Sequence, residues 1–161
     1  KQQAYLEKLS YRDMLTGLYN RNRYIERLEA YKQVQDQQIG AIYIDLNGLK
    51  KVNDERGHRA GDELIVRAAG TIAGIFAEDA YRVGGDEFVV ILLDVSREDF
   101  ARKTEQLRRQ MQENSVDASI GGVWQASTEN LENLLRLADE NMYREKKRYY
   151  SQADAARKPE S

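Results

Sequence analysis

The sequence predicts an α+β fold: a ferredoxin-like βαββαβ core with a mainly antiparallel sheet and flanking helices. Three observations predict it. Apolar residues alternate between strand-like and helix-like periods along residues 39–123, two adjacent glycines join two strand-like runs, and helix-like segments lie on either side. With 161 residues the chain has the length of one domain, which is large enough to bury a core without disulfides. The chain has no cysteine and therefore forms no disulfide.

Helical segments are predicted before the core. Residues 1–12 are predicted to be the stub of a linker helix from an upstream region, because apolar residues between positions 5 and 9 lie at helical spacing. Turn residues surround short apolar ones in residues 13–20, which predicts a loop. An amphipathic helix follows, and its apolar positions are Tyr24, Ile25, Leu28 and Tyr31.

The core starts with a strand and a helix. Residues 39–46 are apolar and β-branched, which is typical of a strand buried on both faces. Residues 62–76 predict a helix with one apolar stripe that would cover a sheet. Between these two elements, Asn53 and Asp54 have the character of turn residues.

A hairpin and three further elements complete the core. Residues 80–83 and 87–93 predict two strands joined by a tight turn at Gly84 and Gly85, because adjacent glycines tolerate positive φ. The remaining predicted elements are a helix over residues 100–111, a strand over residues 116–120 and a final helix over residues 131–142.

The two ends of the chain bound the predicted domain. Residues 151–161 are polar and lack an apolar period, which predicts a disordered tail and leaves residues 13–150 as the single domain. The chain begins at Lys1 without a Met or an apolar signal segment. We therefore expect a cytoplasmic protein or the soluble part of a longer protein, and the sequence leaves membrane attachment of such a parent open.

Composition argues against two classes of partner. There are 25 Lys and Arg residues and 27 Asp and Glu residues, so the formal net charge is −2. A chain with this balance is not expected to bind nucleic acid through a basic face. The longest apolar run, residues 88–93, is far shorter than a membrane span, so we expect no membrane contact by this fragment.

Three carboxylates are predicted to meet at one edge of the sheet. In the βαββαβ order the first and third strands are adjacent and antiparallel, so the end of the first meets the start of the third. Asp45 lies at the end of the first strand, and Asp86 and Glu87 open the third. Carboxylates this close repel one another, so such a site holds a divalent cation or a shared proton, and Mg²⁺ with substrate phosphates is the better match.

The glycines beside these acids fit the same chemistry. A hairpin without β-carbons at Gly84 and Gly85 lets a triphosphate or a sugar lie close to the backbone. Spacing alone leaves an alternative open, in which a Gly-Gly hairpin is simply followed by surface acids. The five-residue string at residues 84–88 favours the functional interpretation, because its chance frequency is about one in a million per window.

Several blocks, in the same order along the chain, resemble the GGDEF family of diguanylate cyclases. The blocks are DMLTGLYNR at 13–21, DLNGLK at 45–50, VND at 52–54, GHRAGD at 57–62, RVGGDEF at 82–88, SIG at 119–121 and ADENMYREK at 138–146. The resemblance runs from Asp13 to about Lys147. It implies a palm-type fold like that of nucleotide cyclases, which agrees with the predicted topology.

The resemblance also implies a reaction and a metal site. Such enzymes condense two GTP molecules into cyclic di-GMP and release two pyrophosphates at a homodimer interface, under the control of an upstream sensor domain in the parent chain. The implied metal ligands are Asp45, Asp86 and the backbone carbonyl of Leu46. Glu87 would ligate a second metal or help to deprotonate the attacking hydroxyl. The implied cofactor is Mg²⁺ or Mn²⁺, two ions per active site.

The substrate GTP would be bound by a second set of residues. By resemblance, Asn53 and Asp62 would hydrogen-bond the guanine edge. A carboxylate accepts hydrogen bonds from N1–H and the exocyclic amine, a donor pair that adenine lacks, so Asp62 is a reason to prefer GTP. The other implied substrate-binding residues are Lys146 at the terminal phosphates, Lys50 as added positive charge, and Gly84 and Gly85 at the hairpin.

The chain departs from the family pattern at several positions. Asn47 stands where the family often has a second aspartate, Leu49 where it often has phenylalanine, and Tyr150 where an arginine commonly follows the lysine by four residues. These departures keep an alternative open: a catalytically silent GGDEF-like module that binds GTP or a partner. The R-x-x-D product-inhibition motif would occupy residues 75–78, where Ile75 and Glu78 do not match, so we expect no feedback through that site.

Overall fold

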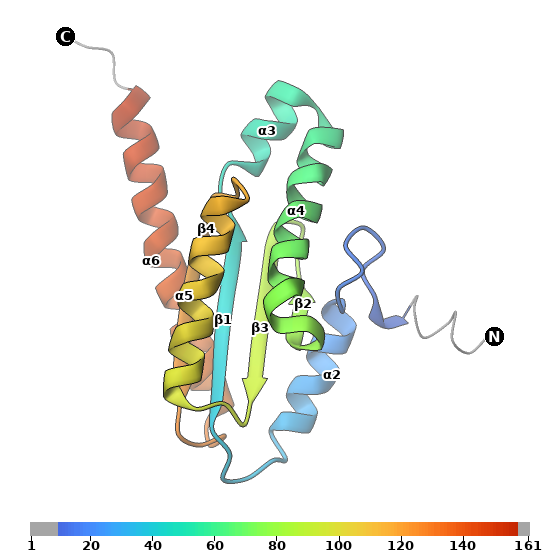
Figure 1. Cartoon of the computed structure of the whole chain (residues 1–161), viewed down its shortest axis with the longest axis vertical. Helices are drawn as coiled ribbons and strands as arrows, with labels where there is room; N and C mark the ends of the chain where they lie inside the picture. The colour runs from blue at the N-terminus through green and yellow to red at the C-terminus, as the bar shows by residue number, and fades with distance from the viewer. Residues whose placement is uncertain (1–9, 158–161) are drawn as a thin grey trace.

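The computed structural model describes residues 10–157. The elements in chain order are α2 (Arg21–Tyr31), β1 (Ile39–Leu46), α3 (Leu49–Arg56), α4 (His58–Phe76), the 3₁₀ turn η1 (Ala77–Asp79), β2 (Ala80–Arg82), β3 (Glu87–Leu93), α5 (Arg97–Glu113), β4 (Ala118–Gln125) and α6 (Leu131–Arg157) (Figure 1). The predicted βαββαβ order and the flanking helices are therefore confirmed. Among these helices, none has the length and apolar character needed to cross a membrane.

The four strands form one sheet in the order β2-β3-β1-β4, and every neighbouring pair is antiparallel. β1 lies at the centre, and its bounds are those predicted from the apolar run. Asp45 near the end of β1 lies opposite Glu87 at the start of β3. The N–H of Leu46 also donates to the carbonyl of Asp86 at 2.9 Å. The pairing register therefore brings the two ends together as the topology predicted.

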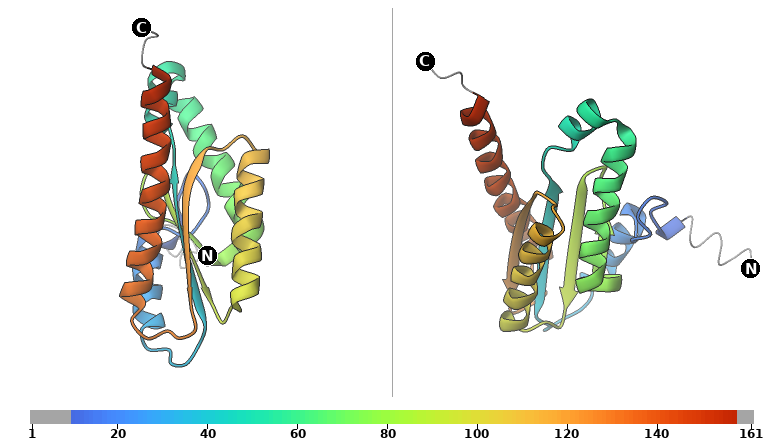
Figure 2. Two further views of the ribbon diagram at one scale, coloured as in Figure 1. Left: turned by 90° about the vertical axis from the view of Figure 1, so that its left-hand side faces the viewer. Right: turned by 45° about the horizontal axis from the view of Figure 1, so that its top comes forward.

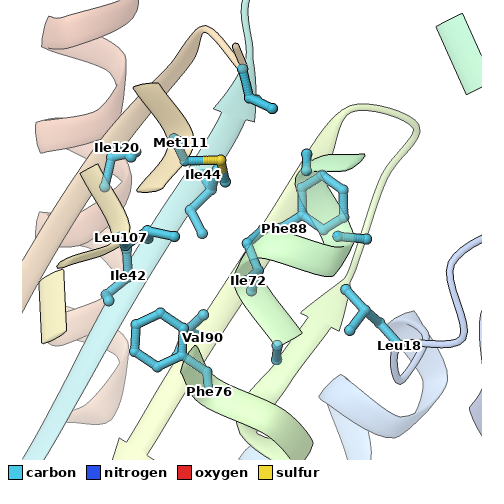
Figure 3. Packing of buried hydrophobic residues seen from close by; sticks show 14 of the residues in the cluster. Leu18, Ile42, Ile44, Ile72, Phe76, Phe88, Val90, Leu107, Met111 and Ile120 are labelled. Carbon is cyan, nitrogen blue, oxygen red and sulfur yellow. The ribbon is translucent and has the colours of Figure 1, made fainter. Parts of the chain in front are cut away.

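Helices cover both faces of the sheet, with α4 and α5 on one side and α6 on the other (Figure 2). Because side chains alternate along a strand, Ile42 and Ile44 of β1 face α4 and α5, while Tyr43 and Asp45 face the side of α6. Figure 3 shows the first of these layers, in which β1 and β3 pack against α4 and α5. Asp45 is thus a polar side chain at the end of an otherwise apolar strand.

Gly121 of β4 lets α6 approach the sheet closely. A Cβ at this position would collide with the backbone nitrogen of Met142 and the backbone carbonyl of Ala138, both in α6. Ala138 and Met142 are themselves buried. The contact fixes the height of α6 along the sheet, and the helix then continues past the end of β1 (Figure 1).

Helix α3 was not predicted. Asn53 and Asp54, expected to be turn residues, lie within it. The helix is bounded by Gly48 and Gly57, whose φ values are 74° and 90°. None of its residues is fully buried, and only Leu49 and Val52 pack against the core, which is too short an apolar pattern to mark a helix in the sequence.

The hairpin between β2 and β3 differs from the prediction in its backbone. Neither Gly84 nor Gly85 has a positive φ. The connection is longer than a tight turn, because the N–H groups of Val83 and Gly84 both point to the carbonyl of Glu87, at 3.0 and 3.4 Å. A Cβ on Gly85 would meet no atom within 4 Å, so the space beside the hairpin is open as expected.

The predicted disordered tail is wrong for residues 151–157, because α6 continues to Arg157. Ala153 is half-buried, so this part of α6 still has an inward-facing side. Residues 158–161 of the predicted tail and residues 1–9 of the predicted linker stub lie outside the described residues. The described end of the stub, Ser10 and Tyr11, is helical.

Arg82 connects the loop before α2 to the β2–β3 hairpin. Its guanidinium donates to both carboxylate oxygens of Asp13, at 3.0 and 3.1 Å, and to the carbonyl of Gly85 at 2.8 Å. Asp13 also accepts from the backbone N–H and the hydroxyl of Thr16, at 2.9 and 2.7 Å. Burial opposes ionisation of Asp13, but these hydrogen bonds hold the pKa of its carboxyl below the ordinary value.

We expect Asp13→Asn to lower the free energy of unfolding by about 2 kcal/mol at neutral pH. A carboxylate whose pKa is lower in the folded than in the unfolded state stabilises the fold above its unfolded pKa. This contribution is lost as pH falls through the folded pKa, so the wild type and the variant should converge below about pH 4. Urea unfolding at neutral and acidic pH measures the difference, and a difference that is independent of pH would contradict the assignment.

Candidate functional site

The predicted carboxylate cluster is present. One ligand oxygen each from Asp45, Asp86 and Glu87 lies within 4.8 Å of the others. Asp45 is buried, Asp86 is half-buried and Glu87 is exposed, so the cluster runs from the sheet interior to the surface. β1 supplies Asp45, β3 supplies Glu87 and the hairpin before β3 supplies Asp86, so the cluster joins positions far apart in the sequence.

Lys146 from α6 completes the cluster with a positive charge. Its ammonium nitrogen lies 2.9 Å from Oδ1 of Asp45 and 3.2 Å from the backbone carbonyl oxygen of Leu46. Both oxygens were expected to bind a metal, and in this structure they accept hydrogen bonds from the Lys146 ammonium. The donor set is all oxygen and acidic, which fits Mg²⁺ or Mn²⁺. Lys146 was predicted at the terminal phosphates of a nucleotide, and the structure places it against the metal ligands.

The surroundings of Asp45 oppose its ionisation. Burial raises the pKa of Asp45 above its ordinary value, and the nearby charges of Asp86 and Glu87 raise it further. The hydrogen bond from Lys146 opposes this rise. Protons and metal ions would therefore compete for Asp45 at a higher pH than for an isolated aspartate.

Asn47 belongs to a separate hydrogen-bond network. Its amide donates to Oδ1 of Asp117 at 2.9 Å, and its side-chain oxygen accepts from the hydroxyl of Ser119 at 2.9 Å. The Asn47 oxygen is thus already used by Ser119. This network was missed from the sequence. Ser119 lies in one of the sequence blocks, but nothing in the sequence marked Asp117.

A cavity of about 420 Å³ opens beside the cluster between α3 and α6. Its wall contains Leu46, Lys50 and Asp86, three of the predicted site residues. Tyr149 and Tyr150 of α6 form the opposite part of the wall, and Tyr150 stands where the family commonly has an arginine. A volume of this size is typical of small-molecule sites.

Asn53 and Asp62 lie in a neighbouring corner between α3 and α4. The side-chain oxygen of Asn53 packs against Gly61, where a Cβ would collide with it, and Asp62 follows on the same turn of α4. Asp62 is exposed. Neither residue lines the 420 Å³ cavity, so the structure separates the predicted guanine contacts from the carboxylates.

A larger hollow of about 710 Å³ lies between α5 and β4. Arg108 and Glu145 cross its wall as an ion pair at 2.9 Å. Among residues 10–157, its wall holds no carboxylate cluster of the kind formed by Asp45, Asp86 and Glu87. We therefore place the functional site at the smaller cavity, where charged groups converge.

Comparison with known proteins gives a family and several relatives. Residues 10–152 match the sequence profile of the family described as diguanylate cyclase, GGDEF domain. The probable diguanylate cyclase DgcJ of Escherichia coli is 35% identical over 141 residues, which cover 81% of this chain and 28% of DgcJ. The diguanylate cyclase DgcS of Shewanella oneidensis is 33% identical over 147 residues, covering 83% of this chain and 49% of DgcS. The chain thus spans less than half the length of these relatives.

A solved structure shows the same fold. The coiled coil and GGDEF domain of DgcB from Caulobacter crescentus, in complex with c-di-GMP, superposes with a TM-score of 0.80. The match covers 91% of this chain and 87% of that chain at 23% identity. The likeness confirms the predicted α+β fold.

Proposed function

The chain belongs to the GGDEF family of diguanylate cyclase domains, and from this membership we propose that it condenses two GTP molecules into cyclic di-GMP and two pyrophosphates. The observation that carries the proposal is the convergence of Asp45, Asp86 and Glu87 beside a cavity. In each half of the reaction a 3′-oxygen bonds to the α-phosphorus of the other GTP, the bond to pyrophosphate breaks, and the hydroxyl proton leaves.

The residues of the cluster have separate parts in this proposal. Asp45, Asp86, Glu87 and the Leu46 carbonyl would hold divalent cations, Mg²⁺ or Mn²⁺, which supply positive charge to the reacting phosphates. Glu87 is the most exposed of the three acids, and it would accept the hydroxyl proton. Lys146, and Lys50 in the cavity wall, would neutralise phosphate oxygens. Gly85, with open space beside it, lets substrate approach the hairpin backbone.

We propose that a homodimer is required for turnover. Each GTP must present its 3′-hydroxyl to the α-phosphate of the other, so a single site with one GTP cannot close the ring. Two domains that face each other supply both nucleotides in the needed orientation. The relatives are longer than this chain. We propose that an upstream sensor domain in the parent protein sets the orientation of the two domains, and that the reaction takes place in the cytoplasm.

The test is a product assay. The purified chain, alone at high concentration and fused to a dimerising coiled coil, is incubated with GTP and Mg²⁺, and nucleotides are resolved by chromatography. Cyclic di-GMP and pyrophosphate from GTP, but not from ATP, are expected. GTP binding without product from either form would instead favour the silent binding module, to which Asn47, Leu49 and Tyr150 point.

Asp62→Ser is expected to relax the choice of base. The Asp62 carboxylate is proposed to accept two hydrogen bonds from guanine, and a hydroxyl cannot replace both. The preference for GTP over ATP, measured as the ratio of kcat/KM values, should fall by about a hundredfold. Asp62 is exposed, so the fold should be unaffected. Glu63→Ser, also exposed on α4, is the matched control, and an unchanged ratio in Asp62→Ser would refute the assignment.

A further inference from the structure

The last turns of α6 continue its inward-facing side past the end of the sheet. Met142 is buried, Lys146 reaches Asp45, and Tyr149 and Ala153 follow at helical spacing, both half-buried. Tyr149 and Ala153 lie in the wall of the 420 Å³ cavity, opposite α3. α6 therefore gives this cavity an aromatic wall, which includes Tyr150 at the position where the family commonly has an arginine.

The hydroxyl of Tyr149 lies over the segment that connects β1 to α3. A Cβ built on Gly48 would be 3.0 Å from that oxygen. Gly48 follows Leu46, whose carbonyl holds Lys146, and precedes Lys50 in the same cavity wall. The phenol oxygen is therefore close to the backbone beside which the charged groups of the site converge.

The hydroxyl of Tyr149 has no hydrogen-bond partner among residues 10–157. By contrast, the hydroxyls of Tyr24 and Tyr43 lie 3.1 Å apart and bond each other. The ring of Tyr149 packs edge-on against Tyr150, with ring centroids 5.3 Å apart. The ring is thus positioned by its neighbour, while its polar end is left for a ligand in the cavity.

The lysines at one side of the cavity favour a phosphate oxygen as the group that this hydroxyl would meet. A phenol is a neutral donor that binds a phosphate oxygen without adding charge. The cavity wall contains Lys50 and Lys51 together with four acids, Asp54, Glu55, Asp86 and Asp154, and Lys146 is held beside it. In a wall of mixed charge, a neutral donor near the lysines can add a hydrogen bond to a phosphate oxygen. Tyr150, where a basic residue was expected, carries no charge and its ring lies 5.7 Å from the Lys146 ammonium.

We propose that Tyr149 is a substrate-binding residue whose hydroxyl donates a hydrogen bond to a phosphate oxygen of the bound nucleoside triphosphate. The contact replaces part of the phosphate binding that Tyr150 does not supply. This inference rests on the proposed function, because it assigns the phosphate end of GTP to the cavity between α3 and α6.

The test compares two tyrosine-to-phenylalanine variants of the same helix. Tyr149→Phe removes only the hydroxyl, and Tyr143→Phe makes the same change at a tyrosine that is 56% exposed and outside the cavity. Binding is measured by calorimetry with Mg²⁺ and two probes: the α,β-methylene analogue of GTP, which cannot release pyrophosphate, and guanosine, which has no phosphate. Tyr149→Phe should weaken the analogue about tenfold and leave guanosine unchanged, while Tyr143→Phe changes neither.

The outcomes separate this inference from the proposed function. If the wild type binds the analogue and Tyr149→Phe binds it equally or more tightly, the hydroxyl contact is overturned and the proposed function stands. An equal loss of affinity for guanosine and the analogue would also overturn it, because the residue would then act on the base or the fold. If the wild type binds neither probe, the proposed function fails, and the role of Tyr149 fails with it.

Discussion

Asp86→Asn is expected to reduce cyclic di-GMP formation by about a thousandfold without unfolding the protein. Asparagine keeps the volume of the side chain and removes the negative charge that the cluster of Asp45, Asp86 and Glu87 needs to hold a divalent cation. The backbone of Asp86 is not affected, because its carbonyl accepts from the N–H of Leu46 at 2.9 Å whichever side chain is present. Loss of activity would therefore report on the carboxylate.

Asp94→Asn is the matched control for this experiment. Asp94 follows β3 at the end opposite to the cluster, is exposed, and has a φ of 56° that asparagine tolerates. Product is measured by chromatography in the dimerised form, and thermal unfolding checks the fold of both variants. Asp94→Asn should keep full activity. If Asp86→Asn retains more than about a tenth of wild-type turnover, the proposed metal role of Asp86 is wrong.

Gly121→Val should give the largest loss of stability, about 3 kcal/mol. The added side chain would run into the backbone of α6 at Ala138 and Met142, and backbone atoms cannot move aside as a flexible side chain can. α6 must then shift away from β4, which opens the core on that face. Urea unfolding monitored by circular dichroism measures the change.

Gly70→Ala is the opposite case and serves as the control. Gly70 lies on the exposed side of α4, and a Cβ there would meet no atom within 4 Å. This substitution should stabilise the protein by about 0.5–1 kcal/mol, because alanine restricts the unfolded chain and favours a helix. A stable Gly121→Val variant would mean that α6 does not depend on close contact with β4.

The contact between Gly121 and α6 marks the limit of what could be predicted about the site from the sequence. The meeting of Asp45 with Glu87 follows from strand order and direction, which the alternating periods along the chain reveal. The position of Lys146 does not, because it depends on the height at which α6 lies against Gly121. A helical period shows which side of a helix faces the core and gives no information on its position along the sheet.

Helix α3 and the hydrogen bonds of Asn47 also could not be predicted from the apolar patterns of the sequence. α3 has no buried residue, and its limits are set by two glycines in unusual backbone conformations at positions 48 and 57. Asn47 matched a family position as an altered aspartate, yet its role in the fold depends on Asp117, which is 70 residues away in the sequence. Such hydrogen bonds join residues that strand pairing brings together, so no local sequence pattern predicts them.

Arg82 also has a thermodynamic consequence. It bonds Asp13 in the loop before α2 and the carbonyl of Gly85 in the hairpin that carries Asp86. If a ligand at the hairpin changes the free energy of the Arg82–Asp13 contact, a change imposed on that contact must alter the affinity for the ligand by the same free energy. A force or binding event at the start of the domain and a nucleotide at the carboxylates would then be reciprocal effectors, each measurable through the other.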